Sequence, residues 1–156
     1  MKKKLKKTAF LVMLTLLLGV LSACGIDSTV EDLFTLPRVP DEYTGLSQQI
    51  DQLLSDGYEY APPTVGQNIQ AVQLEDLNGD GAQEAVVFLR KSNDEKPMKI
   101  LVFEKPNESY ELLCTVESSG SSIDSVYYED LTGDGRNELV VGWRISSTVQ
   151  NVTVYN

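Results

Sequence analysis

Two short acidic stretches of the chain carry oxygen-bearing residues at a spacing that suits a bound cation. They begin at Asp76 and at Asp130, and positions 1, 3, 5 and 9 of each stretch are polar. Position 7 of each could add a main-chain carbonyl. The candidate metal ligands are Asp76, Asn78, Asp80, Ala82 and Glu84 in the first loop, and Asp130, Thr132, Asp134, Arg136 and Glu138 in the second. Hard oxygen donors at alternate positions suit Ca²⁺, which takes roughly 6–8 oxygen ligands.

A helix-flanked calcium loop of the EF-hand type does not fit this pattern, because it needs a bidentate carboxylate at position 12. Position 12 is Val87 in the first loop and Val141 in the second. Both valines lie in apolar runs that predict buried strands, so each loop is expected to join two strands. A polar turn without metal is the alternative, since Asn-Gly and Gly-Asp pairs are common in hairpin turns.

The similarity between the two stretches extends upstream, which indicates one supersecondary unit used twice. Short strands with turns between them are expected near residues 68–75, 84–90, 98–104 and 109–116, and again near 122–129, 138–145 and 150–155. The predicted fold is mainly β, with two antiparallel repeats at 68–121 and 122–156, preceded by a short helical region. The second repeat lacks a fourth strand. We therefore expect either a fragment of a longer repeat protein or an open sheet edge completed by another chain, with self-association or protease sensitivity near the C-terminus.

The two motifs, Asp-x-Asn-Gly-Asp-Gly-x-x-Glu and Asp-x-Thr-Gly-Asp-Gly-x-x-Glu before an apolar strand, resemble the calcium loops of FG-GAP/VCBS-type β-propeller repeats. The resemblance covers about residues 68–156. Thr132 at position 3 and Glu at position 9 depart from the usual family pattern. The resemblance implies propeller-blade-like units, Ca²⁺ as the cofactor, and a role in binding other macromolecules outside the cytoplasm. The helix-then-repeat layout is also similar to uncharacterised bacterial lipoproteins.

The N-terminus has the features of a signal peptide over residues 1–23. Five lysines precede an apolar run, Ala9 to Val20, that is short for a membrane span. The following Leu21-Ser22-Ala23-Cys24 resembles a bacterial lipobox, which implies cleavage before Cys24 and a diacylglycerol on its thiol. The chain would then be anchored to the outer face of the cell membrane. An ordinary secretory signal with a nearby cysteine is the alternative.

Residues 24–67 are expected to form a linker with two short helices. Ser28 to Glu31 has the spacing of a capping box. Asp41 is expected to cap a second helix that ends at Asp56-Gly57. The apolar residues of this helix share one face that should pack on the β-domain: Tyr43, Leu46, Ile50, Leu53 and Leu54.

Composition excludes several kinds of chemistry. The chain has no His, which excludes His-assisted nucleophiles and His zinc sites. Cys114 lies in an expected strand, where a small buried hydrophobe is its expected role. Without the leader, 8 basic residues face 23 acidic ones, a net charge of −15 that disfavours nucleic-acid binding.

The expected function is that of a lipid-anchored, extracytoplasmic, calcium-binding β-repeat module that binds or scaffolds a protein or glycan of the cell envelope. A structural lipoprotein with metal-free turns is the main alternative. A carboxylate-based hydrolase is less favoured, because no acid stands in an obviously apolar setting that would raise its pKa. We therefore do not expect an enzyme.

Overall fold

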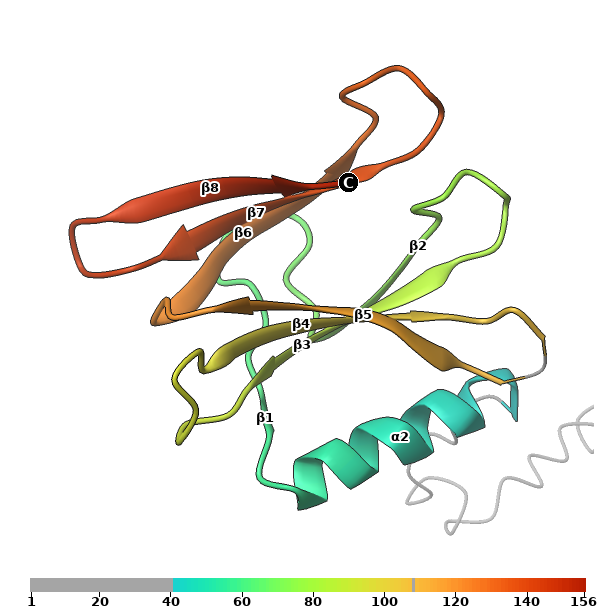
Figure 1. Cartoon of the computed structure of the whole chain (residues 1–156), viewed down its shortest axis with the longest axis horizontal. Helices are drawn as coiled ribbons and strands as arrows, with labels where there is room; N and C mark the ends of the chain where they lie inside the picture. The colour runs from blue at the N-terminus through green and yellow to red at the C-terminus, as the bar shows by residue number, and fades with distance from the viewer. Residues whose placement is uncertain (1–40, 108) are drawn as a thin grey trace, which may run out of the picture. The chain divides into compact units, whose positions relative to one another are not determined.

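A computed structural model describes residues 41–107 and 109–156, which belong to one compact unit, Val39–Asn156. The signal peptide, Cys24 and the expected helix near Ser28 lie outside the described residues. The fold is mainly β, with two antiparallel sheets and one α-helix (Figure 1). No helix within the described part of the chain combines the length and apolar character that crossing a membrane requires.

The first sheet contains β1 (Glu59–Tyr60), β2 (Val72–Glu75), β3 (Glu84–Arg90), β4 (Met98–Glu104) and β5 (Glu111–Ser118). Its order is β1-β3-β4-β5, and β2 pairs with the same side of β3 as β1 does. The strands predicted at 84–90, 98–104 and 109–116 are confirmed. The first strand starts later than predicted, because the side-chain amide of Gln73 bonds the carbonyls of Asn68 and Gln70 and curls that segment.

The second sheet contains β6 (Ser122–Glu129), β7 (Glu138–Arg144) and β8 (Gln150–Tyr155), in the order β6-β7-β8. These strands confirm the three predicted for the second repeat. Among the described residues, no fourth strand pairs with β8, whereas β5 pairs with β4 at the equivalent place in the first sheet. The two sheets thus hold unequal numbers of strands.

Strand β3 is apolar along most of its length because both of its faces are covered. Its side chains alternate between the two sides of the sheet, as the pleat requires. Val86 and Phe88 belong to one buried cluster, while Ala85, Val87 and Leu89 belong to another. This double burial explains the unbroken apolar run in the sequence.

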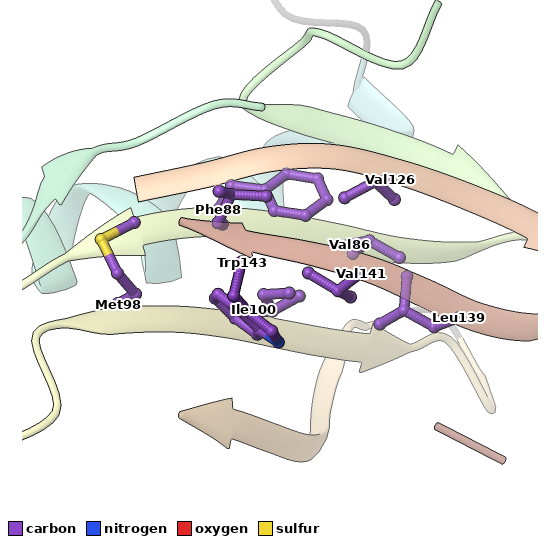
Figure 2. Close-up of a cluster of buried hydrophobic side chains, with 9 residues drawn as sticks. Val86, Phe88, Met98, Ile100, Val126, Leu139, Val141 and Trp143 are labelled. Carbon is purple, nitrogen blue, oxygen red and sulfur yellow. The ribbon is translucent and has the colours of Figure 1, made fainter. Parts of the chain in front are cut away.

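The first cluster lies between the two sheets. The first sheet contributes Val86, Phe88, Met98 and Ile100, and the second contributes Ile123, Val126, Leu139, Val141 and Trp143 (Figure 2). Removing apolar area from water is the main favourable term in such packing, at about 1.5–3 kcal/mol for each large side chain. This cluster therefore joins the two repeats.

The second cluster lies between the first sheet and α2 (Thr44–Ser55). Leu46 and Ile50 are buried one helical turn apart, which confirms that the predicted apolar face packs on the β-domain. The helix ends at Ser55, with Asp56 as its C-cap, and Gly57 follows with a φ of 89°. The predicted cap was wrong: the N-cap is Tyr43, without a side-chain hydrogen bond, and Asp41 lies in a 3₁₀ turn (Asp41–Tyr43) before it.

Two further features concern β5, the edge strand of the first sheet. Cys114 is exposed, so its predicted burial was wrong. The physical reason is that the three-stranded second sheet does not cover β5, the edge strand of the five-stranded first sheet. Besides its backbone pairing with β4, the strand is held by the buried Lys99, whose ammonium bonds Glu117 on β5 and lies 2.9 Å from Asp94. Burial alone would lower the pKa of Lys99, but the hydrogen bonds to Glu117 and Asp94 outweigh it and raise that pKa.

Candidate functional site

The first candidate loop connects β2 to β3 and folds around its first acid. The carboxylate of Asp76 accepts hydrogen bonds from the N–H groups of Gly79, at 2.8 Å, and Gly81, at 2.9 Å. The carbonyl oxygen of the Asn78 side chain accepts the N–H of Asp80, and one oxygen of Asp80 accepts the N–H of Ala82. Oxygens at positions 1, 3 and 5 thus organise the loop by binding its own backbone.

The second loop connects β6 to β7 and repeats this arrangement. Asp130 accepts from Gly133 at 2.6 Å and from Gly135 at 3.0 Å, and Asp134 accepts from Arg136 at 3.0 Å. One difference follows from the residue at position 3. Both position 3 side chains donate to the position 9 glutamate. Asn78 has a separate carbonyl oxygen that accepts the N–H of Asp80, whereas in the second loop Asp130 accepts the N–H of Asp134.

The acid at position 9 of each loop is directed inward. Glu84 and Glu138 are only 3% and 2% exposed. One oxygen of Glu84 accepts the N–H of Leu77 at 2.8 Å, and one oxygen of Glu138 accepts the N–H of Leu131 at 2.7 Å. Each hydrogen bond joins the last residue of the loop to its second residue. The buried glutamate therefore links the two ends of its loop.

The surroundings of two of the loop acids shift their pKa values in opposite directions. The N–H of Gly135, with those of Gly133 and Asp134, holds the pKa of Asp130 below its usual value, so this carboxylate is ionised at neutral pH. Burial raises the pKa of Glu84, and the negative charges of Asp80 and Asp76 add to that effect. The expectation that no acid stands in an apolar setting was therefore wrong for Glu84.

The two loops contact each other. A Cβ atom built on Gly79 would lie 2.3 Å from the carbonyl oxygen of Gly135, so only glycine fits there. Asn137 then joins the second loop to the first: its N–H donates to the Leu77 carbonyl at 2.9 Å, and its side-chain amide donates to the Asp76 carbonyl at 3.0 Å. These contacts were not expected, because nothing in the repeat pattern marks position 8 of the second loop as different from Gln83 in the first.

In each loop, the expected ligand residues lie on one connection between two strands, β2–β3 or β6–β7. Side chains at positions 3 and 5 are exposed, whereas the position 9 acids are buried. Within the described ranges, no three His, Cys, Asp or Glu residues are arranged closely enough to hold a metal ion. The donor chemistry nevertheless fits calcium, because an oxygen that accepts one N–H keeps a second lone pair.

Comparison of the chain with protein-family models, with curated proteins and with solved structures gives no match. The functional argument therefore depends on the geometry of the loops and on the sequence motifs.

The loop contact leads to a matched pair of substitutions. Gly79 and Gly133 occupy the same loop position with the same φ of 77°, but a Cβ on Gly133 would meet nothing within 4 Å. Ala at either position adopts a left-handed conformation that costs about 1–2 kcal/mol. We expect Gly79→Ala to cost about 1–3 kcal/mol more than Gly133→Ala, because it must also push the loops apart.

Urea unfolding of the two variants measures this difference in the free energy of unfolding. Equal losses for Gly79→Ala and Gly133→Ala would show that the contact between the loops contributes nothing to stability.

Proposed function

We propose that the two loops bind Ca²⁺ and that the chain is a lipid-anchored binding or scaffolding module of the cell envelope. The observation that carries the calcium proposal is the shared arrangement of both loops. In its own loop, each of Asp76 and Asp130 accepts the N–H groups of the glycines three and five residues on. Asp80 and Asp134 each accept the N–H two residues on, and Glu84 and Glu138 bond the main chain of the loop from the buried side.

In the first loop, Asp76, Asn78, Asp80 and the Ala82 carbonyl are the donors nearest solvent, and Glu84 completes the set. In the second loop, the corresponding residues are Asp130, Thr132, Asp134, the Arg136 carbonyl and Glu138. A bound cation would supply positive charge that offsets the repulsion among Asp76, Asp80 and Glu84. That repulsion contributes to the raised pKa of Glu84.

The two stacked sheets support a propeller-blade-like role for each repeat. Each repeat supplies consecutive antiparallel strands, and the sheets pack face to face through an apolar cluster. Blades of this kind stack with neighbours and present their connecting loops at one end, which suits a binding surface. The anchor follows from the motif ending at Cys24, and the acid excess of the chain favours a cation over an anionic ligand.

A structural role with metal-free turns is the second candidate. The observation that favours it is that the loop oxygens are already bonded to backbone N–H groups of the same loop. Such turns hold their shape without a metal.

Asp80→Asn and Asp134→Asn separate these candidates. Each keeps an oxygen for the backbone N–H that the aspartate binds and removes one negative charge. Extracellular calcium sites bind at roughly 10⁻⁴–10⁻³ M. At about 1 mM calcium and a Kd near 0.1 mM, one site stabilises the fold by about 1.4 kcal/mol. We expect each variant to lose its own site in calorimetry, and the first loop to bind more tightly because the Asn78 carbonyl is a better donor than the Thr132 hydroxyl.

Glu95→Gln is the control for charge alone, because Glu95 is an exposed acid in a turn outside both loops. It should leave calcium binding unchanged. Absence of heat and of any melting shift at several millimolar calcium in the parent chain would remove the calcium proposal and leave the structural role.

Cys24→Ala tests the anchor. Loss of the thiol should block lipid attachment and leave the precursor uncleaved or released from the membrane, as membrane fractionation and intact mass measure. A single acyl chain anchors only weakly, so stable attachment depends on more than one chain. A variant that is cleaved and retained in membranes like the parent would refute the lipoprotein assignment.

A further inference from the structure

Asn78 and Gly79 form a chemically reactive pair in the first loop. Asn78 is the one asparagine of the sequence that is followed by glycine. A backbone nitrogen can attack the side-chain carbonyl carbon of a preceding asparagine, and glycine presents that nitrogen without a side chain to hinder the approach. Both residues are exposed, so water reaches them. The pair is therefore a candidate site for a modification that the chain carries out on itself.

The attacking group would be the N–H of Gly79, which already donates to a carboxylate. The Gly79 nitrogen lies 2.8 Å from Oδ1 of Asp76. An amide nitrogen is a poor nucleophile while it holds its proton, so a base placed on that proton favours the attack. Proton transfer to a positioned side chain contributes about 10²–10⁴ to the rate of such steps. Asp76 is in contact with the proton that must leave and is placed to accept it.

The side chain of Asn78 is held with its carbonyl group ready for attack. Its oxygen accepts the N–H of Asp80 at 2.8 Å, and its NH₂ group donates to Oε1 of Glu84 at 3.2 Å. A backbone N–H can only donate, so it identifies the end nearest Asp80 as the oxygen. Negative charge develops on this oxygen when the nitrogen attacks. A donor already bonded to it stabilises that charge, as in an oxyanion hole.

We propose that the first loop promotes the deamidation of its own Asn78. The Gly79 nitrogen forms a bond to Cγ of Asn78 and closes a cyclic imide, and the bond from Cγ to the side-chain nitrogen breaks. The Gly79 proton passes to Asp76 and on through water to the departing nitrogen, which leaves as ammonia. Water then opens the imide at one of its two carbonyl carbons. The product is aspartate or isoaspartate at position 78, and the reaction consumes only water.

The second loop repeats this geometry without the reactive side chain. Gly133 donates to Asp130 at 2.6 Å, as Gly79 donates to Asp76. Position 3 of the second loop is Thr132, whose hydroxyl cannot form an imide. The modification is therefore confined to one of two loops that are otherwise similar.

Each product changes the first loop in a defined way. Aspartate adds a carboxylate beside those of Asp76, Asp80 and Glu84, which increases the repulsion within the loop. Isoaspartate routes the main chain through the former side chain and lengthens the backbone next to Gly79. That glycine has little room, because a Cβ on it would lie 2.3 Å from the Gly135 carbonyl oxygen. Both products disturb the contact between the loops. Only an effect on calcium rests on the proposed function, since position 3 supplies one of the proposed ligands.

Asp56→Asn supplies an internal comparison within the full chain. Asp56 precedes Gly57, so the variant holds a second asparagine–glycine pair at an exposed position. Gly57 has a φ of 89°, close to the 77° of Gly79, but its N–H donates to the Leu54 carbonyl at 3.1 Å rather than to a carboxylate. The variant should fold like the parent, because the new amide keeps an oxygen for the Gln52 side chain that Asp56 accepts.

The variant is incubated in mild detergent at neutral pH with a calcium chelator, and mass spectrometry of its peptides follows both positions. We expect position 78 to deamidate at least about tenfold faster than position 56, because only position 78 has a positioned base. Equal rates, or a faster reaction at position 56, would overturn the proposal. Since the chelator removes calcium, this result is separate from the calcium titration that tests the proposed function.

Asp76→Asn tests the base directly. The variant keeps an oxygen for the Gly79 N–H and loses the carboxylate that takes the proton, so deamidation of Asn78 should slow about tenfold or more. Glu95→Gln removes an exposed charge outside both loops and should leave the rate unchanged. An unchanged rate in Asp76→Asn, with the circular dichroism spectrum of the parent, would refute the proposal. If that variant does not fold, the comparison within Asp56→Asn decides, because it leaves the first loop intact.

Discussion

Burial of two apolar sheet faces against each other is the interaction on which the rest of the structure depends. Phe88 and Trp143 come from different repeats and share one cluster, so each sheet needs the other to bury the apolar side chains of its inner face. This packing brings the β2–β3 and β6–β7 connections into contact, and it leaves β5 exposed because the three-stranded sheet does not cover the whole of the five-stranded one. The contact between the loops and the exposure of β5 are both consequences of how these two unequal sheets stack.

The loops show how a cluster of acids is tolerated in such a fold. Their carboxylates bind backbone N–H groups that would otherwise have no partner at a tight turn, while Glu84 and Glu138 are buried against the loop mouths. The close approach of Gly79 to Gly135 and the hydrogen bond from the Asn137 side chain to the Asp76 carbonyl join the two loops. An ion held in one loop would therefore act on backbone that is in contact with the other.

The strands could be predicted from the sequence because their signals are local. The apolar runs after each loop and the polar turns between them place β3, β4, β6, β7 and β8 within a residue or two. Tertiary relations account for the errors. Cys114 has the surroundings of a core residue, but its exposure depends on how many strands the opposite sheet contains. Asp41 is a good capping residue, but the helix begins three residues later, and the burial of Glu84 depends on the amide of Leu77 seven residues away.

The central claim is that the two repeats fold as one unit through the cluster between the sheets. Trp143 is the single tryptophan of the chain and is buried in that cluster, so its fluorescence reports on the stacking of the sheets, while far-ultraviolet circular dichroism reports on the strands themselves. The most direct measurement is urea unfolding followed by both signals on the same samples. The account predicts one transition with the same midpoint for both. A loss of the Trp143 signal at lower urea, with strand content retained until a second transition, would show that the sheets are stable apart and would contradict it.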